Sequence, residues 1–141
     1  MNVIVDDRLL IEELLVGIER NDESIHTTMY WYYRACRAAV AGAGGHLSGP
    51  FGDVPRAEQQ RAIASILQLP VNVGLPQARE TVPRMVDVAT RHPQLNLLNL
   101  EAVAAARTLE ATLWLSPAGA SGVLPRVLDL EGIPWETVLL A

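Results

Sequence analysis

The chain has 141 residues, half of them hydrophobic, and therefore enough apolar side chains to build one complete core; residues 1–141 are expected to form a single domain. Its net charge of −5 disfavours non-specific coating of nucleic acid, and the absence of lysine excludes Schiff-base chemistry and lysine-based phosphate loops. With Cys36 as its single cysteine and no stretch long enough to span a membrane, we expect a cytoplasmic protein.

The N-terminal two thirds of the chain are predicted to open with a strand and to continue mainly as helices. The apolar run Val3–Val5 predicts the strand, and Thr28 is predicted to cap a long helix. The glycine-rich stretch 42–50 is predicted to be a flexible connection. In chain order we expect a strand at 3–5, a helix at 8–16, an extended piece at 25–28, and helices at 29–41, 56–67 and 77–91.

The C-terminal third alternates helices with strands. We expect a helix at 99–110, a buried strand at 112–115, a helix at 122–130 and a last strand at 134–139. Strands that alternate with helices indicate a parallel sheet with helices on both of its faces. The predicted fold class is therefore α/β.

Two acidic residues, Asp6 and Asp7, follow the first strand directly and precede its helix. A carboxylate at this end of a parallel strand lies where open α/β sheets place their binding sites. It is also where an acid caps a helix and interacts favourably with the positive end of the helix dipole. The sequence leaves both hypotheses open, a residual metal site and a helix cap.

The only tyrosines of the chain lie in the predicted helix 29–41, next to two arginines. Tyr30, Arg34 and Arg37 share one helix face, whereas Trp31 and Ala35 share another that is predicted to face the core. Aromatic and arginine side chains together can contact single-stranded RNA. They are also enriched at subunit interfaces, and this leaves packing in a homodimer as the other hypothesis.

Taken in order, these elements resemble the PIN domain family over nearly the whole chain. The resemblance rests on the strand that ends in aspartate, the segment "LPVNVG" followed by a long helix, the run "LNLLNLEAVAAARTLEATLWLSPA" and the closing "GIPWETV". It implies a PIN-like three-layer α/β/α sandwich with a small, mostly parallel sheet. It also implies a metal-dependent ribonuclease site, in which three or four carboxylates hold Mg²⁺ or Mn²⁺ and the metal activates water.

Most of the acids of that family have no counterpart in this chain. The first acid matches Asp6, with Asp7 beside it. The second falls near Tyr33 or Arg34, the third falls on Asn99 with Glu101 nearby but expected to point away, and the fourth falls on Ser116 or Pro117. The resemblance thus leaves Asp6 and Asp7 as candidate metal ligands and Asp6 and Asn99 as candidate catalytic residues. One acid of about four implies weak binding of a hard cation.

The sequence therefore favours a PIN-like domain with a degenerate active site, acting as an RNA-binding or partner-binding module. An antitoxin-like protein is one expected partner, and Tyr30, Arg34 and Arg37 are the expected surface. The alternatives are a toxin-like Mg²⁺- or Mn²⁺-dependent ribonuclease that uses Asp6 with non-standard ligands, and a homodimeric interaction domain.

Overall fold

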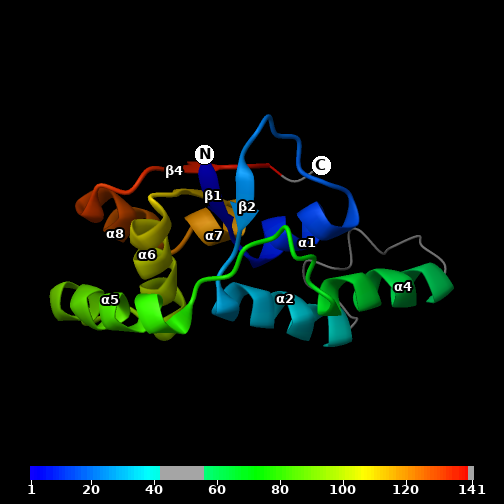
Figure 1. The fold of residues 1–141 in the computed structure, drawn as a ribbon, viewed down its shortest axis with the longest axis horizontal. Coiled ribbons are helices and arrows are strands. Elements are labelled where there is room, and N and C mark those ends of the chain that lie inside the picture. The colour runs from blue at the N-terminus through cyan, green and yellow to red at the C-terminus, as the bar shows by residue number, and fades with distance from the viewer. Residues whose placement is uncertain (42–55, 140–141) are drawn as a thin grey trace.

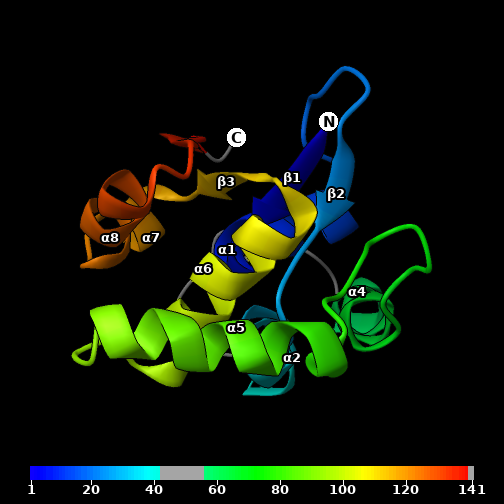
Figure 2. The same ribbon diagram turned by 60° about the vertical axis from the view of Figure 1, so that its left-hand side comes forward.

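The computed structural model describes residues 1–41 and 56–139, and these form a parallel sheet with helices on both faces (Figure 1, Figure 2). The predicted connection at 42–50 lies outside the described residues. In chain order the elements are β1 (Asn2–Val5), α1 (Asp7–Leu15), β2 (Ser24–His26), α2 (Met29–Ala41), α4 (Arg56–Leu67), α5 (Ala78–Arg91), α6 (Leu97–Leu109), β3 (Thr112–Leu115), α7 (Pro117–Ala120), α8 (Leu124–Glu131) and β4 (Trp135–Thr137).

The sheet has the strand order β2-β1-β3-β4, and every neighbouring pair is parallel. In the register, Val3 of β1 lies between Ile25 of β2 and Thr112 of β3. The central strands β1 and β3 are short apolar runs that are buried on both faces, as strands of covered parallel sheets are. The predicted α/β class and the parallel sheet are confirmed.

Alternate residues of the central strands divide the core into two layers. Ile4, Leu113 and Leu115 pack on one side with residues of α6 and α8. Val5 and Trp114 pack on the other side with residues of α1, α2 and α4. This alternation follows from strand geometry, in which successive side chains point to opposite faces. The resulting order of layers is helix, sheet, helix.

Two regions of the C-terminal half differ in detail from the prediction. The predicted helix at 122–130 is α8, which runs from Leu124 to Glu131, and it is preceded by the short helix α7, which was not predicted; Ser116 caps α7 and proline occupies its first position. Helix α6 begins at Leu97 rather than at Asn99, since Asn96 is its N-cap.

Among the described helices, none is both long and apolar enough to cross a membrane.

Candidate functional site

The carboxylate of Asp6 lies where β1 ends and α1 begins, and it is bonded on both oxygens. Oδ1 accepts the backbone N–H of Leu9 at 3.0 Å and so caps α1. Oδ2 accepts both the backbone N–H of Ser116 at 2.8 Å and its Oγ–H at 2.7 Å. Asp6 is only 1% exposed. Its carboxylate therefore ties the start of α1 to the end of β3, and the cap hypothesis is confirmed.

Gly119 of α7 closes this environment from one side. A Cβ atom at Gly119 would lie 2.3 Å from Oδ2 of Asp6, which is shorter than a real contact permits. Its backbone N–H also donates to Oγ of Ser116 at 3.2 Å. Only glycine allows the backbone of α7 to approach the carboxylate so closely. The first turn of α7 thus belongs to the immediate surroundings of Asp6.

Burial and hydrogen bonding act on Asp6 in opposite directions. Removal from water raises the pKa of Asp6, and the nearby charge of Asp7 raises it further. The hydrogen bonds from Leu9 and Ser116 lower the pKa, but burial is the larger effect. A folded-state pKa above the unfolded value means that Asp6 binds a proton more readily in the folded chain.

The neighbouring acid, Asp7, is buried in the first turn of α1 and lies opposite an arginine of α2. Its Oδ2 atom is 3.3 Å from Nε of Arg34, an ion-pair distance, but it accepts no hydrogen bond within the described part of the chain. The side chain of Arg34 is 56% exposed, so its guanidinium reaches from the surface toward the acid. The place that the resemblance gives to a second acid, near Tyr33 or Arg34, thus carries a positive charge beside Asp7.

Glu101 is fully buried in α6, and its carboxylate binds the start of α2 rather than Asp6 or Asp7. Its Oε2 atom accepts the backbone N–H of Met29 and its Oε1 atom accepts that of Tyr30, both at 2.9 Å. The carboxylate therefore binds the N-terminus of α2, where free N–H groups and the helix dipole favour an anion. Thr28 completes this helix start as predicted, because its Oγ1 accepts the N–H of Trp31 at 3.1 Å.

Asn99, the other candidate in this helix, lies in the first turn of α6 and is half-buried. Its backbone N–H donates to Oδ1 of the N-cap Asn96 at 2.9 Å. Within the described residues its side chain makes no hydrogen bond, to Asp6 or to any other group. A sequence signal for Glu101 did exist, since it is the single acid on the buried side of an otherwise apolar, alanine-rich helix.

These donor atoms do not fit the divalent cation that the resemblance implies. Mg²⁺ and Mn²⁺ prefer several oxygen ligands with free lone pairs, most often carboxylates. Asp6 is engaged by three protein donors, Asp7 faces a guanidinium, and Glu101 binds the start of α2. Among the residues that the structure describes, no group of three or more His, Cys, Asp or Glu side chains could hold a metal ion.

The outward face of α2 combines apolar and basic side chains. Tyr33, Cys36, Arg37, Val40 and Ala41 line a shallow hollow along it. Trp31 and Ala35, on the opposite face, are buried in the core as predicted. Tyr30, Arg34 and Arg37 lie on the helix face that the spacing predicted. The structure thus presents these three side chains on one accessible helix without showing what they bind.

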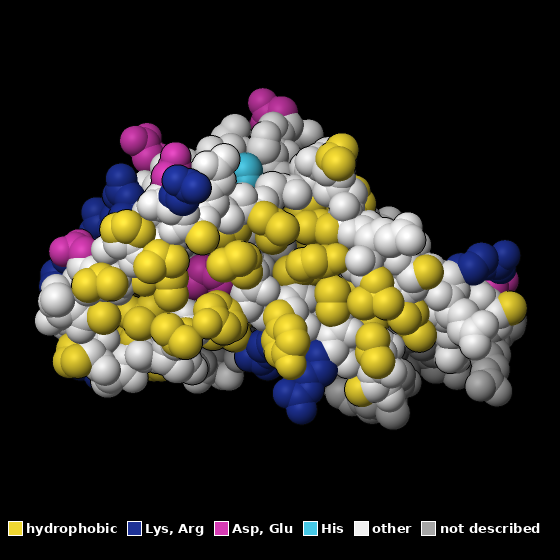
Figure 3. Space-filling view, turned by 60° about the horizontal axis from the view of Figure 1, so that its bottom comes forward, with side chains coloured by type: hydrophobic (Ala, Val, Ile, Leu, Met, Phe, Trp, Pro, Cys, Tyr) yellow, Lys and Arg dark blue, Asp and Glu magenta, His cyan; other side chains and the backbone are white. Residues whose placement is uncertain are grey.

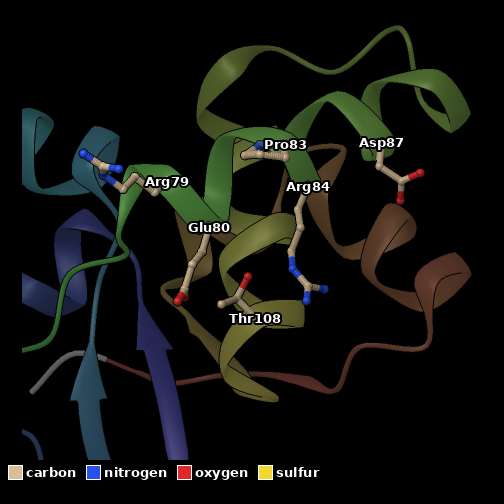
Figure 4. A pocket seen from close by; sticks show the side chains of 6 residues that line it. All are labelled: Arg79, Glu80, Pro83, Arg84, Asp87 and Thr108. Carbon is tan, nitrogen blue, oxygen red and sulfur yellow. The ribbon is translucent and has the colours of Figure 1, made fainter.

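A groove between α5 and α6 has walls of mixed charge. Its lining residues are Arg79, Glu80, Pro83, Arg84, Asp87 and Thr108. Figure 4 shows Glu80 and Arg84 projecting from α5 to the side on which Thr108 of α6 lies. Because arginines and acids alternate along it, the groove offers no field of one sign that would favour an anion or a cation.

Beside this groove, Glu131 joins three helices through an ion-pair cluster. Its carboxylate accepts Arg91 of α5 at 2.8 and 3.0 Å and Arg107 of α6 at 3.0 Å, and it lies 2.9 Å from Nε2 of His92. The hydrogen bonds from Arg91, followed by those from His92 and Arg107, lower the pKa of Glu131 to about 2, although burial opposes them. The cluster therefore stabilises the docking of α8 on α5 and α6.

Replacing Glu131 by glutamine is expected to lower the free energy of unfolding by about 1 to 2 kcal/mol at neutral pH. Because the folded pKa is depressed, this contribution is present above pH 4.5, the ordinary value, and is lost as the pH falls toward 2. Urea unfolding of both proteins across this range tests it, with the exposed Glu136→Gln as control. A difference between wild type and Glu131→Gln that does not shrink in acid would contradict the ion-pair role.

Comparisons with known proteins bear on the fold. No protein-family model matches the sequence, and no curated protein matches it. Among solved structures, the chain is similar to one in the structure of VapBC-1 from nontypeable Haemophilus influenzae, with a TM-score of 0.56 and 11% sequence identity. The match covers 97% of this chain and 98% of that one. With the four-stranded parallel sheet and its two helical layers, the chain therefore has a PIN-like three-layer α/β fold.

Proposed function

We propose that this chain is a PIN-like module that binds a protein partner and does not cleave RNA through a metal. The single observation that carries the second half of the proposal is the state of Asp6. This acid has three protein donors on its two oxygens and a backbone turn against it. A carboxylate in that state is not available as a ligand unless Ser116 and α7 move. A fold alone does not imply an activity, because activity resides in the site.

The first half of the proposal rests on the exposed apolar side chains of one face. Figure 3 shows this face, with hydrophobic side chains spread across a large part of it. On α2, Tyr33 is 61% and Val40 69% exposed, and Met29 lies one helical turn before Tyr33. On α5, Val82 and Val86 are exposed with the same four-residue spacing. Large exposed apolar side chains that gather on one face are typical of an interaction site.

The charge of α2 favours an acidic partner over a second copy of the chain. Every charged residue of α2 is an arginine, although the whole chain has a net charge of −5. A two-fold dimer through the outward stripe of α2 would bring the arginines of both copies together, and like charges in an interface are costly. An amphipathic, acidic segment of another protein fits better. The fold shared with the VapBC-1 chain supports an antitoxin-like protein in this role.

Substituting Tyr33 by aspartate is expected to weaken partner binding by about 100-fold, because it buries a charge at the centre of an apolar contact. The partner is identified by capture on the tagged chain in its native cells and purified, and its affinity for wild type and variant is measured by calorimetry. Val123→Asp, at an exposed valine that directly precedes α8 rather than in α2, is the matched control.

Three results would contradict the proposed function. Equal losses in Tyr33→Asp and Val123→Asp would show that the α2 face is not the interface. Capture of RNA without a protein would favour the RNA-binding alternative, with Tyr30, Arg34 and Arg37 as the surface. A dimer in sedimentation that Tyr33→Asp dissociates would favour the homodimeric alternative.

A further inference from the structure

We propose that the acid pair at the end of β1 is a metal-independent tie, in which the guanidinium of Arg34 supplies the positive charge that a divalent cation would otherwise supply. This inference concerns Asp6, Asp7 and their surroundings, and it does not depend on the partner proposed for α2. It begins from the disagreement between the implied metal site and the donors that the chain provides.

Asp7 has a positively charged neighbour in Arg34. This residue is buried, and its Oδ2 atom accepts no hydrogen bond from the described residues. An ionised carboxylate without donors is costly to bury unless a positive charge lies close to it. Arg34 is that charge, because its Nε atom is 3.3 Å away. Arginine keeps its charge at every physiological pH, so the compensation is permanent.

Asp6 accepts hydrogen bonds from protein groups on both of its carboxylate oxygens, without any cation. Two of its three donors come from Ser116 and the third from Leu9. Gly119 lies so close to Oδ2 that a Cβ atom at this position would be only 2.3 Å from it. The two acids thus have separate partners: neutral hydrogen-bond donors bind Asp6, and a guanidinium pairs with Asp7. Among the described residues, they belong to no group of three or more His, Cys, Asp or Glu side chains that could hold a metal ion.

The residues of the tie come from separate elements of the fold. Asp6 and Asp7 follow β1, Ser116 follows the neighbouring strand β3, and Arg34 comes from α2. The tie therefore joins both central strands to α1 and, through Arg34, to α2. A divalent ion would join the same elements by coordination. The chain achieves this with its own side chains and so does not require metal to hold this end of the sheet together.

The test is thermal unfolding with Mn²⁺ or with a chelator, using wild type, Arg34→Gln and Arg37→Gln. Wild type is expected to melt at the same temperature in both conditions. Arg34→Gln leaves Asp7 without its counter-charge. In chelator, the melting temperature of this variant is expected to lie below that of wild type, and Mn²⁺ is expected to raise it by about 3 °C above the value in chelator. Arg37→Gln, an arginine of the same helix without an ion pair among the described residues, should behave like wild type.

A further variant separates a specific effect from a general one. In Arg34→Gln combined with Asp7→Asn no uncompensated carboxylate remains at this position, so the response to Mn²⁺ should disappear. The proposal is overturned if Mn²⁺ raises the melting temperature of wild type as much as that of Arg34→Gln. It is also overturned if Arg34→Gln does not respond to Mn²⁺. If Arg34→Gln does not fold in chelator, recovery of its circular dichroism spectrum in Mn²⁺ but not in chelator replaces the melting curve as the readout.

Discussion

Replacing Asp6 by alanine is expected to lower the free energy of unfolding by about 3 kcal/mol. The substitution removes the cap of α1 and leaves the buried N–H of Ser116 without its acceptor, and each loss is costly in a buried position. The loss should be larger in acid than at neutral pH. Because burial raises the pKa of Asp6, the stability linked to its protonation is present below 3.8 and is lost as the pH rises through the folded pKa.

Urea unfolding followed by circular dichroism measures this difference, at neutral pH and near pH 4. Asp22→Ala, an exposed acid in the connection between α1 and β2, is the control and should change stability very little. An Asp6→Ala protein that is as stable as wild type, or more stable, would mean that the carboxylates repel each other in an open metal pocket. The hydrogen bonds from Ser116 would then not be a stabilising feature.

Replacing Glu101 by alanine is expected to cost about 2 to 3 kcal/mol. Both oxygens of this buried carboxylate accept backbone N–H groups at the start of α2, so the truncation leaves Met29 and Tyr30 without acceptors and opens a cavity between α6 and α2. Amide exchange at Met29 and Tyr30 should accelerate more than exchange at the other end of the helix, because only the first turn loses its partner.

The matched control is Asn99→Ala, two residues earlier in the same helix. Its side chain makes no hydrogen bond within the described residues, so its stability should stay within about 0.5 kcal/mol of wild type. Equal and small effects of Glu101→Ala and Asn99→Ala would contradict the role assigned to Glu101. A large effect of Asn99→Ala alone would instead show that Asn99 has a role that its observed contacts do not reveal.

Local patterns predicted most of the fold because the signals lie within a few residues of one another. The apolar run before Asp6 predicted β1, and Thr28 predicted the start of α2. The short helix α7 was missed although Ser116 and Pro117 form a helix start, since four residues carry no periodicity. The predicted start of the helix at 99 instead of Leu97 is an error of boundary, since Asn96 is the N-cap of α6.

The surroundings of the candidate site were less accessible to sequence reasoning, because its contacts join residues far apart in the chain. The bond between Asp6 and Ser116 spans 110 residues, and that between Glu101 and Met29 spans 72. Helical spacing assigned Arg34 correctly to an outward face, but only the packing of α2 against α1 brings its guanidinium to Asp7. The resemblance placed one family acid near Arg34 and another on Ser116 or Pro117, and in the structure Arg34 lies beside Asp7 and Ser116 donates to Asp6. It did not indicate that Leu9 and Ser116 donate hydrogen bonds to the carboxylate of Asp6.

Asp6 and Asp7 contribute to stability at the end of the sheet, but the main driving force for folding comes from the two apolar core layers. Both core layers of this chain are built from apolar side chains of the strands and helices, and the acids lie at the edge where the strands end. Burial of those apolar side chains supplies the main driving force for folding. The contacts of Asp6 add to this stability because they join the start of α1 to the end of β3.

The most direct test of the account is a crystal structure of the wild-type chain grown with Mn²⁺, with data collected to show the anomalous scattering of manganese. We expect no manganese peak at Asp6, with Oδ2 still bonded to the backbone N–H and the hydroxyl of Ser116, and with Arg34 beside Asp7. A manganese ion within about 2.5 Å of Asp6, with the hydroxyl of Ser116 turned away, would contradict the account. It would favour the alternative of a metal-dependent ribonuclease that uses Asp6.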